Sequence, residues 1–198
     1  MLGPGTGLGV AHLRRDGVGG YHVQSTEGGH VDFAPLDSVE DMILARLRAR
    51  HSRVSVERLV AGPAIVDIYE ALAAIEGKVL GNLSDVEIWS QGLDGGDSLA
   101  SAAVERFCLC LGAVAGDVAL TQGGFAGVVI AGGLGYRIRD VLVRSGFADR
   151  FRAKGRFREL MSSITVKILL HENAGLYGAA AAFAARHRGE FAAQKDPD

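Results

Sequence analysis

Near its start the chain reads Gly3-Pro4-Gly5-Thr6-Gly7-Leu8-Gly9, with a glycine at every second position. Because glycine lacks a Cβ atom, successive N–H groups of such a turn can converge on one anion, and the Thr6 hydroxyl adds another donor. The stretch is not a Walker loop, because the lysine is missing, nor a dinucleotide fingerprint, because no helix follows a strand here. By itself it is compatible with a phosphate-binding turn or with a plain hairpin.

A second short motif is Glu27-Gly28-Gly29-His30. A carboxylate accepts hydrogen bonds from two adjacent hydroxyl groups, whereas an imidazole can donate to one hydroxyl and accept from another. The two glycines allow a tight backbone, so that both side chains can face one hydroxyl-rich ligand. On the tetrapeptide alone, an ordinary turn with an exposed glutamate and histidine explains the residues equally well.

The third motif, Val128-Val129-Ile130-Ala131-Gly132-Gly133, is an apolar strand that ends in two glycines. Such an ending lets a flat base approach the backbone, although a strand that merely runs into a turn gives the same pattern.

Around these motifs, predicted strands alternate with predicted helices, which indicates the α/β class. The hydrophobic periods and turn signals predict strands at 8–14, 21–25, 127–131 and 165–170, helices at 38–50, 64–75, 98–120, 137–145 and 175–188, and a disordered tail at 194–198. We expect Ser38 to open the first helix, Asp97 or Ser98 to cap a central buried one, and Ser55 to cap a short helix that carries Glu57.

The composition narrows the function classes. The 198 residues include 21 basic and 23 acidic side chains, a net charge of −2 that argues against a nucleic-acid partner. No apolar run of bilayer-spanning length and no leader are expected, which places the chain in the cytoplasm by default.

Other residues that could carry chemistry have structural interpretations. Cys108 and Cys110 are expected to be buried free thiols, and His51, His171 and Glu172 lack the spacing of a metal site, so no metal ligand is predicted. The basic stretch from Arg137 to Arg158 includes acidic residues and predicts a solvated face. Trp89, Asp117 and the methionines are interpreted as structural.

Together and in this order, the three motifs resemble the bacterial glucokinases, ATP-dependent sugar kinases of the actin-like ATPase superfamily. The resemblance continues through Lys154-Gly155-Arg156-Phe157 to the stretch 171–176. It implies an α/β, ribonuclease H-like large lobe with a mixed sheet and flanking helices at 1–170, a C-terminal helix at 171–190 that packs on a small lobe, and a tail at 191–198. We expect the small lobe, with the general-base aspartate and the first phosphate loop, to lie outside this sequence.

The resemblance also implies a role for each motif. It places Gly5, Thr6 and Gly7 on the second phosphate loop, and Gly132 and Gly133 on the adenosine motif. Glu27, His30 and Glu57 match glucose-binding positions; Glu57 would otherwise pass for a solvated helix residue. The implied reaction is phosphoryl transfer from ATP, with Mg²⁺, to the 6-hydroxyl of D-glucose. Since no catalytic residue is assigned within the chain, little or no turnover is expected from it alone.

Three alternatives stay open. The first is a kinase or repressor of the related repressor–open-reading-frame–kinase group, although no cysteine-rich motif follows His30. The second is a non-catalytic sugar-binding or assembly module, and the third is an actin-like ATPase without a sugar substrate, which would leave the two glutamates and His30 unexplained. A homodimer also remains open.

Overall fold

The computed structural model describes residues 1–17, 20–80, 82–171 and 173–187. Its centre is a five-stranded sheet with the order β3-β2-β1-β4-β5. The strands are β1 (Leu2–Pro4), β2 (Leu8–Arg15), β3 (Tyr21–Thr26), β4 (Val128–Ile130) and β5 (Val166–Ile168). The pairs β1–β2 and β2–β3 are antiparallel, whereas β4 runs parallel to both β1 and β5. The predicted α/β class with a mixed sheet is therefore confirmed.

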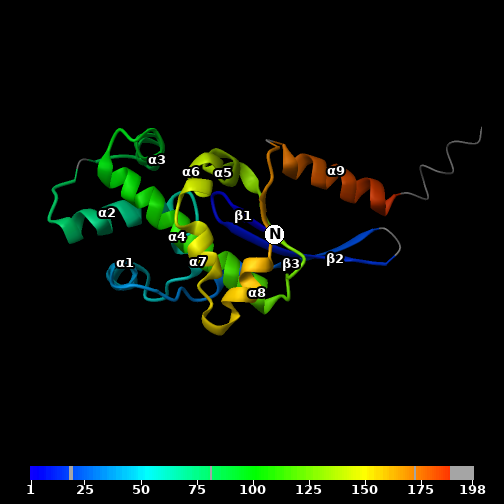
Figure 1. Cartoon of the computed structure of the whole chain (residues 1–198). Coiled ribbons are helices and arrows are strands. Elements are labelled where there is room, and N and C mark those ends of the chain that lie inside the picture. The colour runs from blue at the N-terminus through cyan, green and yellow to red at the C-terminus, as the bar shows by residue number, and fades with distance from the viewer. Residues whose placement is uncertain (18–19, 81, 172, 188–198) are drawn as a thin grey trace, which may run out of the picture.

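The hairpin of β2 and β3 forms where it was predicted, and it projects away from the first four helices, on the same side as the C-terminal helix (Figure 1). Asp16 and Gly20 close its end, because the Asp16 N–H donates to the Gly20 carbonyl over 3.2 Å. Strand β1 was not predicted. Its three residues are too short to show a period, and they had been included in the glycine-rich turn.

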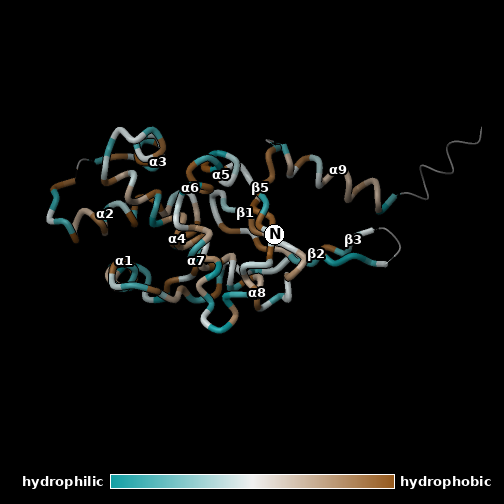
Figure 2. The backbone as a smooth tube through the Cα atoms, viewed as in Figure 1, coloured by the Kyte–Doolittle hydropathy of each residue, from teal (hydrophilic) through white to brown (hydrophobic). Residues whose placement is uncertain are grey.

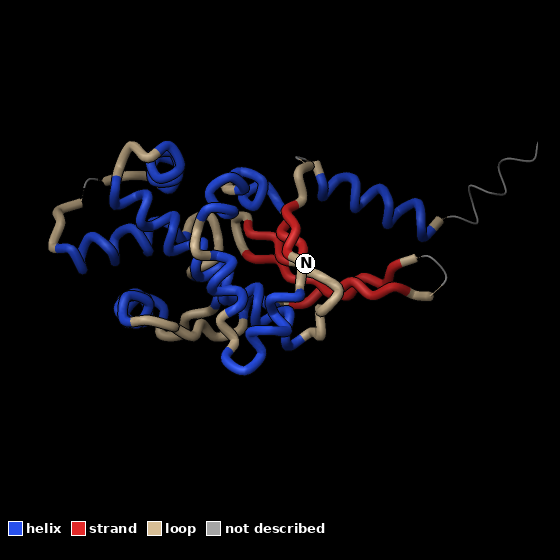
Figure 3. The backbone as a smooth tube through the Cα atoms, viewed as in Figure 1, coloured by secondary structure: helices blue, strands red, loops and turns tan. Residues whose placement is uncertain are grey.

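Most of the helices gather on one side of the sheet, around a long central helix, whereas the C-terminal helix lies apart from them (Figure 3). The first four are α1 (Ser38–His51), α2 (Ala64–Glu76), α3 (Asp85–Asp94) and α4 (Ser98–Thr121). Helix α1 begins at Ser38 as predicted, and Asp37 caps it, since its carboxylate accepts the Glu40 N–H over 3.0 Å. Helix α3 was missed, although Ser84 and Glu87 form a complete capping box that marks its start.

Helix α4 is the apolar centre of this half of the molecule. It is 24 residues long and apolar enough to cross a membrane by length and composition, so the expectation that no run of that kind exists was wrong. Of its most apolar window, however, 72% is buried inside the protein, as in the core helix of a globular domain. Trp89 of α3 packs edge-on against Phe107 of α4, with ring centroids 5.1 Å apart.

Two glycines of α4 let a second helix approach closely. A Cβ atom on Gly112 would overlap the Phe147 carbonyl oxygen, and one on Gly116 would lie 2.6 Å from the Phe151 carbonyl oxygen. Both carbonyls belong to α7 (Phe147–Arg152). The helix predicted at 137–145 forms as α6 (Arg139–Arg144), and short elements that were not predicted flank it: α5 (Gly132–Arg137), α7, the 3₁₀ turn η3 (Gly155–Phe157) and α8 (Arg158–Ser163).

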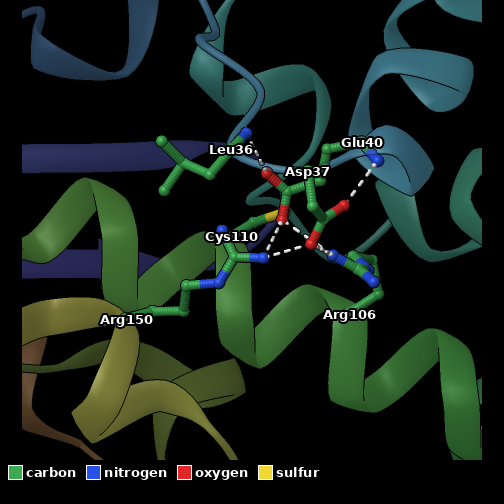
Figure 4. Close-up of polar contacts among 6 residues, drawn as sticks. All are labelled: Leu36, Asp37, Glu40, Arg106, Cys110 and Arg150. Carbon is green, nitrogen blue, oxygen red and sulfur yellow. Dashed lines mark hydrogen bonds and ion pairs between the residues drawn. The ribbon is translucent and has the colours of Figure 1, made fainter. Parts of the chain in front are cut away.

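A buried ion cluster, formed by Asp37, Glu40, Arg106 and Arg150, ties α1, α4 and α7 together (Figure 4). The Arg106 guanidinium lies 2.6 Å from Asp37 and 2.9 Å from Glu40, and Arg150 contacts both carboxylates as well. Glu40 is only 1% exposed. Partial burial favours a higher pKa for Asp37, but hydrogen bonds from the Glu40 N–H and from Arg106 outweigh it and lower the pKa.

The cluster corrects the interpretation of the basic stretch as a solvated face. Arg150 points into the protein, and Lys154 donates to the Ala113 carbonyl and to Asp117 over 2.8 and 2.7 Å. Both side chains are mostly buried. The two predicted free thiols are confirmed: burial raises the pKa of Cys108 to about 12, and that of Cys110 well above its ordinary value.

Helix α9 (Ala174–Arg186) differs from the other long helices, because none of its residues is buried. Leu176, Tyr177 and Phe183 are 71%, 67% and 59% exposed. Figure 2 shows its apolar segments away from the helical body. The end of the predicted helix at Arg188, the expected tail and Glu172 lie outside the described residues.

Candidate functional site: two glycine turns and a carboxylate beside His30

The first glycine-rich turn joins β1 to β2, and it is held by backbone hydrogen bonds. Within it, the Gly5 N–H donates to the Gly7 carbonyl over 2.8 Å. The Gly5 carbonyl accepts the Gly62 N–H over 2.7 Å, at the start of α2. The Gly62 carbonyl in turn accepts the indole N–H of Trp89 over 2.9 Å. A buried tryptophan therefore anchors the turn to the core, while Thr6 at its tip is exposed.

The second glycine turn lies beside the first, because β1 and β4 are parallel neighbours that end at the same edge of the sheet. Gly132 has φ = 86°, a conformation that favours glycine. A Cβ atom there would also lie 3.0 Å from the Pro4 carbonyl oxygen. A Cβ atom on Gly133 would meet nothing within 4 Å, so this position faces open space. The two motifs, distant in sequence, thus form one glycine-lined edge.

The Glu27–His30 motif forms the 3₁₀ turn η1 (Gly28–His30), which lies directly on β2. A Cβ atom on Gly28 would be 3.0 Å from the Cβ of Val10, and one on Gly29 would be 2.5 Å from the Leu8 carbonyl oxygen. The glycines are therefore needed because β2 leaves no room for side chains. This contact refines the sequence interpretation, which had assigned them to backbone tightness alone.

A short antiparallel pairing brings Glu57 to His30. The Val56 N–H donates to the Val31 carbonyl over 2.9 Å, and the Phe33 N–H donates to the Val54 carbonyl over 3.0 Å. Glu57 lies in the 3₁₀ turn η2 (Val56–Arg58), which follows Ser55 as predicted, although the Ser55 side chain makes no capping bond. As a result, the His30 Nδ1 atom is 3.9 Å from Glu57 Oε1.

The other oxygen of Glu57 contacts the end of the first glycine turn. Glu57 Oε2 accepts the Leu8 N–H over 2.7 Å, immediately after Gly7. One carboxylate thus contacts the first glycine turn through Oε2 and faces His30 through Oε1. The His30 side chain is 59% exposed and that of Glu57 33%, so both remain accessible to a ligand.

Arg53 fixes the backbone on the other side of His30. Its Nη2 group donates to the His30 carbonyl over 2.6 Å, and its Nε lies 2.7 Å from Asp32 Oδ1. The sequence analysis missed this residue, and no local signal distinguishes it from other surface arginines.

Glu27 is placed less tightly than its two partners. The backbone links it to His30, whose N–H donates to the Glu27 carbonyl over 2.9 Å. Its side chain is exposed and, within the described residues, makes no hydrogen bond or ion pair. The convergence of His30 and Glu57 is thus an observed contact, whereas that of the Glu27 carboxylate stays a prediction.

A hollow of about 200 Å³ lies between the first glycine turn and η2. It is lined by Thr6, Glu57, Arg58, Ala61, Pro63, Ala64 and Asp67. Arg58, which the sequence analysis did not select, brings a cation to the same hollow as Thr6 and Glu57. The only sequence signal for Arg58 was its position directly after Glu57.

The mixed sheet with its flanking helices is an α/β fold, and the solved structures to which the chain is similar place it in the actin-like ATPase class. The chain is similar to the crystal structure of a glucokinase from an Antarctic psychrotroph, with 35% identity, a TM-score of 0.82, and coverage of 91% of this chain and 56% of that chain. A ROK family glucokinase from Streptomyces griseus, solved in complex with glucose and AMPPNP, shares the fold at a TM-score of 0.53 and 19% identity.

The chain belongs to the glucokinase family, whose sequence profile matches residues 1–186. It is 58% identical over 187 residues to a glucokinase of Zymomonas mobilis, an alignment that covers 94% of this chain and 57% of the relative. A glucokinase of Caulobacter vibrioides is 47% identical over 189 residues and is covered to 55%. The chain therefore spans little more than half the length of these curated relatives.

Proposed function

We propose that this chain forms a large part of the substrate cleft of an ATP-dependent glucokinase, which phosphorylates the 6-hydroxyl of D-glucose to glucose 6-phosphate in the cytoplasm. The observation that carries the proposal is the position of Glu57, whose carboxylate contacts both the first glycine turn and the His30 side of the site. A kinase must bring a hydroxyl and a phosphoryl group together, and this residue lies where the two binding elements meet.

In the proposed sugar site, Glu27, His30 and Glu57 bind the hydroxyl groups of glucose. Carboxylates accept from hydroxyls, and the imidazole can donate or accept, so the three side chains suit a ring with several hydroxyls. A site of this kind discriminates strongly, because an analogue that lacks a hydroxyl leaves a polar group without a partner.

In the proposed nucleotide site, Gly5, Thr6 and Gly7 hold phosphate groups, and Gly132 and Gly133 lie against the adenosine. The adjacent ends of β1 and β4 support this assignment, because one nucleotide can then contact both turns. When bound, ATP supplies the phosphoryl group that is transferred. The described residues contain no group of three or more His, Cys, Asp or Glu side chains able to hold a metal ion.

The general base is proposed to come from a part of the enzyme that this sequence does not include, together with a small lobe on which the segment 171–190 packs. Loss of a general base typically reduces a rate by about 10²–10⁴-fold. We therefore expect this chain to bind its ligands more readily than it turns them over.

The test compares two histidine variants by titration calorimetry with glucose and, separately, with AMPPNP. We expect His30→Ala to weaken glucose binding by about 1–3 kcal/mol, the cost of a lost hydrogen bond in a partly buried site, and to leave nucleotide binding nearly unchanged. His22→Ala, which removes an exposed histidine from β3, is the matched control and should change neither. Equal losses for both ligands in His30→Ala would contradict the sugar-contact role.

A non-catalytic sugar-binding module is the second candidate, because no general base is assigned among the residues of this chain. A coupled assay for ADP release, run beside the calorimetry, separates the two. Heat from glucose without turnover in the longer protein would favour the module.

A further inference from the structure

We propose that Gly7 is a positioning residue for the sugar site, because only a residue without a side chain at this position lets the Glu57 carboxylate reach the Leu8 amide. The inference rests on the proposed function and deepens it, since it assigns a glycine of the phosphate turn to glucose binding as well.

The first step of the argument is the fit between Gly7 and Glu57. A Cβ atom on Gly7 would lie 2.5 Å from Glu57 Oε2 and 3.2 Å from its Cδ. Carbon and oxygen atoms do not approach this closely, so any side chain at position 7 displaces the carboxylate. The φ angle of Gly7 is not positive, so the left-handed conformation that strains an alanine is not required at this position.

The second step is what the displaced carboxylate would lose. Glu57 Oε2 accepts the Leu8 N–H over 2.7 Å, and this bond orients the side chain. The remaining oxygen, Oε1, is thereby held 3.9 Å from His30 Nδ1. A carboxylate forced out of this position points one oxygen away from His30, and the two side chains no longer present a joint surface to hydroxyl groups.

The third step is that the neighbouring elements leave Leu8 no alternative arrangement. Gly29, in the 3₁₀ turn η1, packs against the Leu8 carbonyl so closely that a Cβ atom on Gly29 would be 2.5 Å from the carbonyl oxygen. Leu8 itself is buried. The start of β2 is therefore enclosed between η1 and Glu57. When a side chain is added at position 7, the Glu57 side chain is the group that can move at the lowest energetic cost.

The experiment uses Gly7→Ala, with Gly9→Ala as the matched control. The nearest atom to a Cβ on Gly9 is 3.9 Å away, an ordinary contact, so this variant adds the same methyl group two residues further on, in β2, without touching Glu57. We expect hydrogen exchange of the Leu8 amide, followed by NMR, to be accelerated at least ~10-fold in Gly7→Ala and unchanged in Gly9→Ala. Glu57→Ala, which releases the same amide without adding a methyl group, should accelerate it to the same extent.

Glucose affinity supplies the second readout. We expect Gly7→Ala to weaken glucose binding by roughly 10-fold and to have no further effect in a Glu57→Ala background, because both changes act through one carboxylate. An equal loss in both backgrounds, or an unchanged Leu8 amide in Gly7→Ala, would overturn the inference. An unaltered protein that binds no glucose would overturn the proposed function instead, whereas the Leu8 amide would still decide whether Gly7 positions Glu57.

Discussion

Helices α4 and α9 are both rich in alanine and apolar residues, yet they lie in opposite environments. Helix α4 contacts α2, α3 and α7 and is largely buried, whereas no residue of α9 is buried. The apolar stripe of Leu176, Ala180, Phe183 and Ala184 resembles that of a core helix in spacing alone. The difference shows that helical periodicity predicts which face of a helix is apolar, but not whether another element packs on that face.

The same contrast exists between two ion clusters. One cluster lies between α1, α4 and α7 and consists of Asp37, Glu40, Arg106 and Arg150. The other joins α1 to α2 at the surface and consists of Arg46, Arg50, Asp67 and Glu70. A surface ion pair is screened by water and contributes little, whereas removal of one partner from a buried cluster leaves charges without compensation. Substitutions in the two clusters therefore test whether burial of an ion pair determines how much it contributes to the stability of the fold.

The largest effect is expected from Glu40→Gln. The substitution leaves Arg106 and Arg150, which are only 14% and 16% exposed, with one carboxylate in place of two. We expect the free energy of unfolding to fall by about 3–5 kcal/mol, measured by urea denaturation. The matched control Glu70→Gln acts on the surface cluster and should cost about 0–1 kcal/mol. Similar losses in the two variants would show that burial does not separate the clusters.

A smaller effect is expected where α4 meets α7. Gly112→Ala adds a methyl group that overlaps the Phe147 carbonyl, so the two helices must move apart. Overpacking of this kind costs about 1–3 kcal/mol, which exceeds the gain in helix propensity from alanine. Thermal unfolding checks the sign: a variant of equal or greater stability would mean that α7 is free to shift and that the interface is not rigid.

Much of the fold could be predicted from the sequence, and most of the missed elements are short. The hairpin, α1, α2 and α4 carry long or regular hydrophobic patterns, and the three-residue strands β4 and β5 lie within the apolar runs 127–131 and 165–170; all form within a few residues of their predicted bounds. Strand β1 lies in a glycine-rich stretch, and the short helices α5, α7 and α8 are too brief to show a period, whereas α3 was missed despite its capping box. Arg150 was misplaced because the pattern of the stretch was read as polar, whereas its partners, Asp37 and Glu40, are more than 100 residues away in sequence.

The site shows a similar division. Its residue types follow from local motifs, since Glu27, His30 and the glycine turns are adjacent in sequence to the residues that define them. The contact between Glu57 and Leu8 could not be predicted, because it joins two segments through the pairing of residues 31–33 with 54–56. The sequence likewise could not show that Gly7 and Gly29 leave room for the Glu57 carboxylate and the Leu8 carbonyl.

The smallest effect on global stability is expected in α9. Gly178→Ala replaces a glycine whose Cβ would meet nothing within 4 Å, so it should stabilise the helix by about 0.5–1 kcal/mol through backbone entropy alone. Global unfolding should shift by less than about 0.5 kcal/mol, because the helix is not packed on the domain and an isolated helix of this length is marginal in water.

Amide exchange across 174–186 should be fast in the unaltered chain, and measurably slower in the variant. Alternatively, self-association that buries Leu176 and Phe183 would protect the segment in proportion to protein concentration. Strong exchange protection in a monomer at all concentrations would contradict the contrast with α4, because it would mean that the domain alone supports this helix.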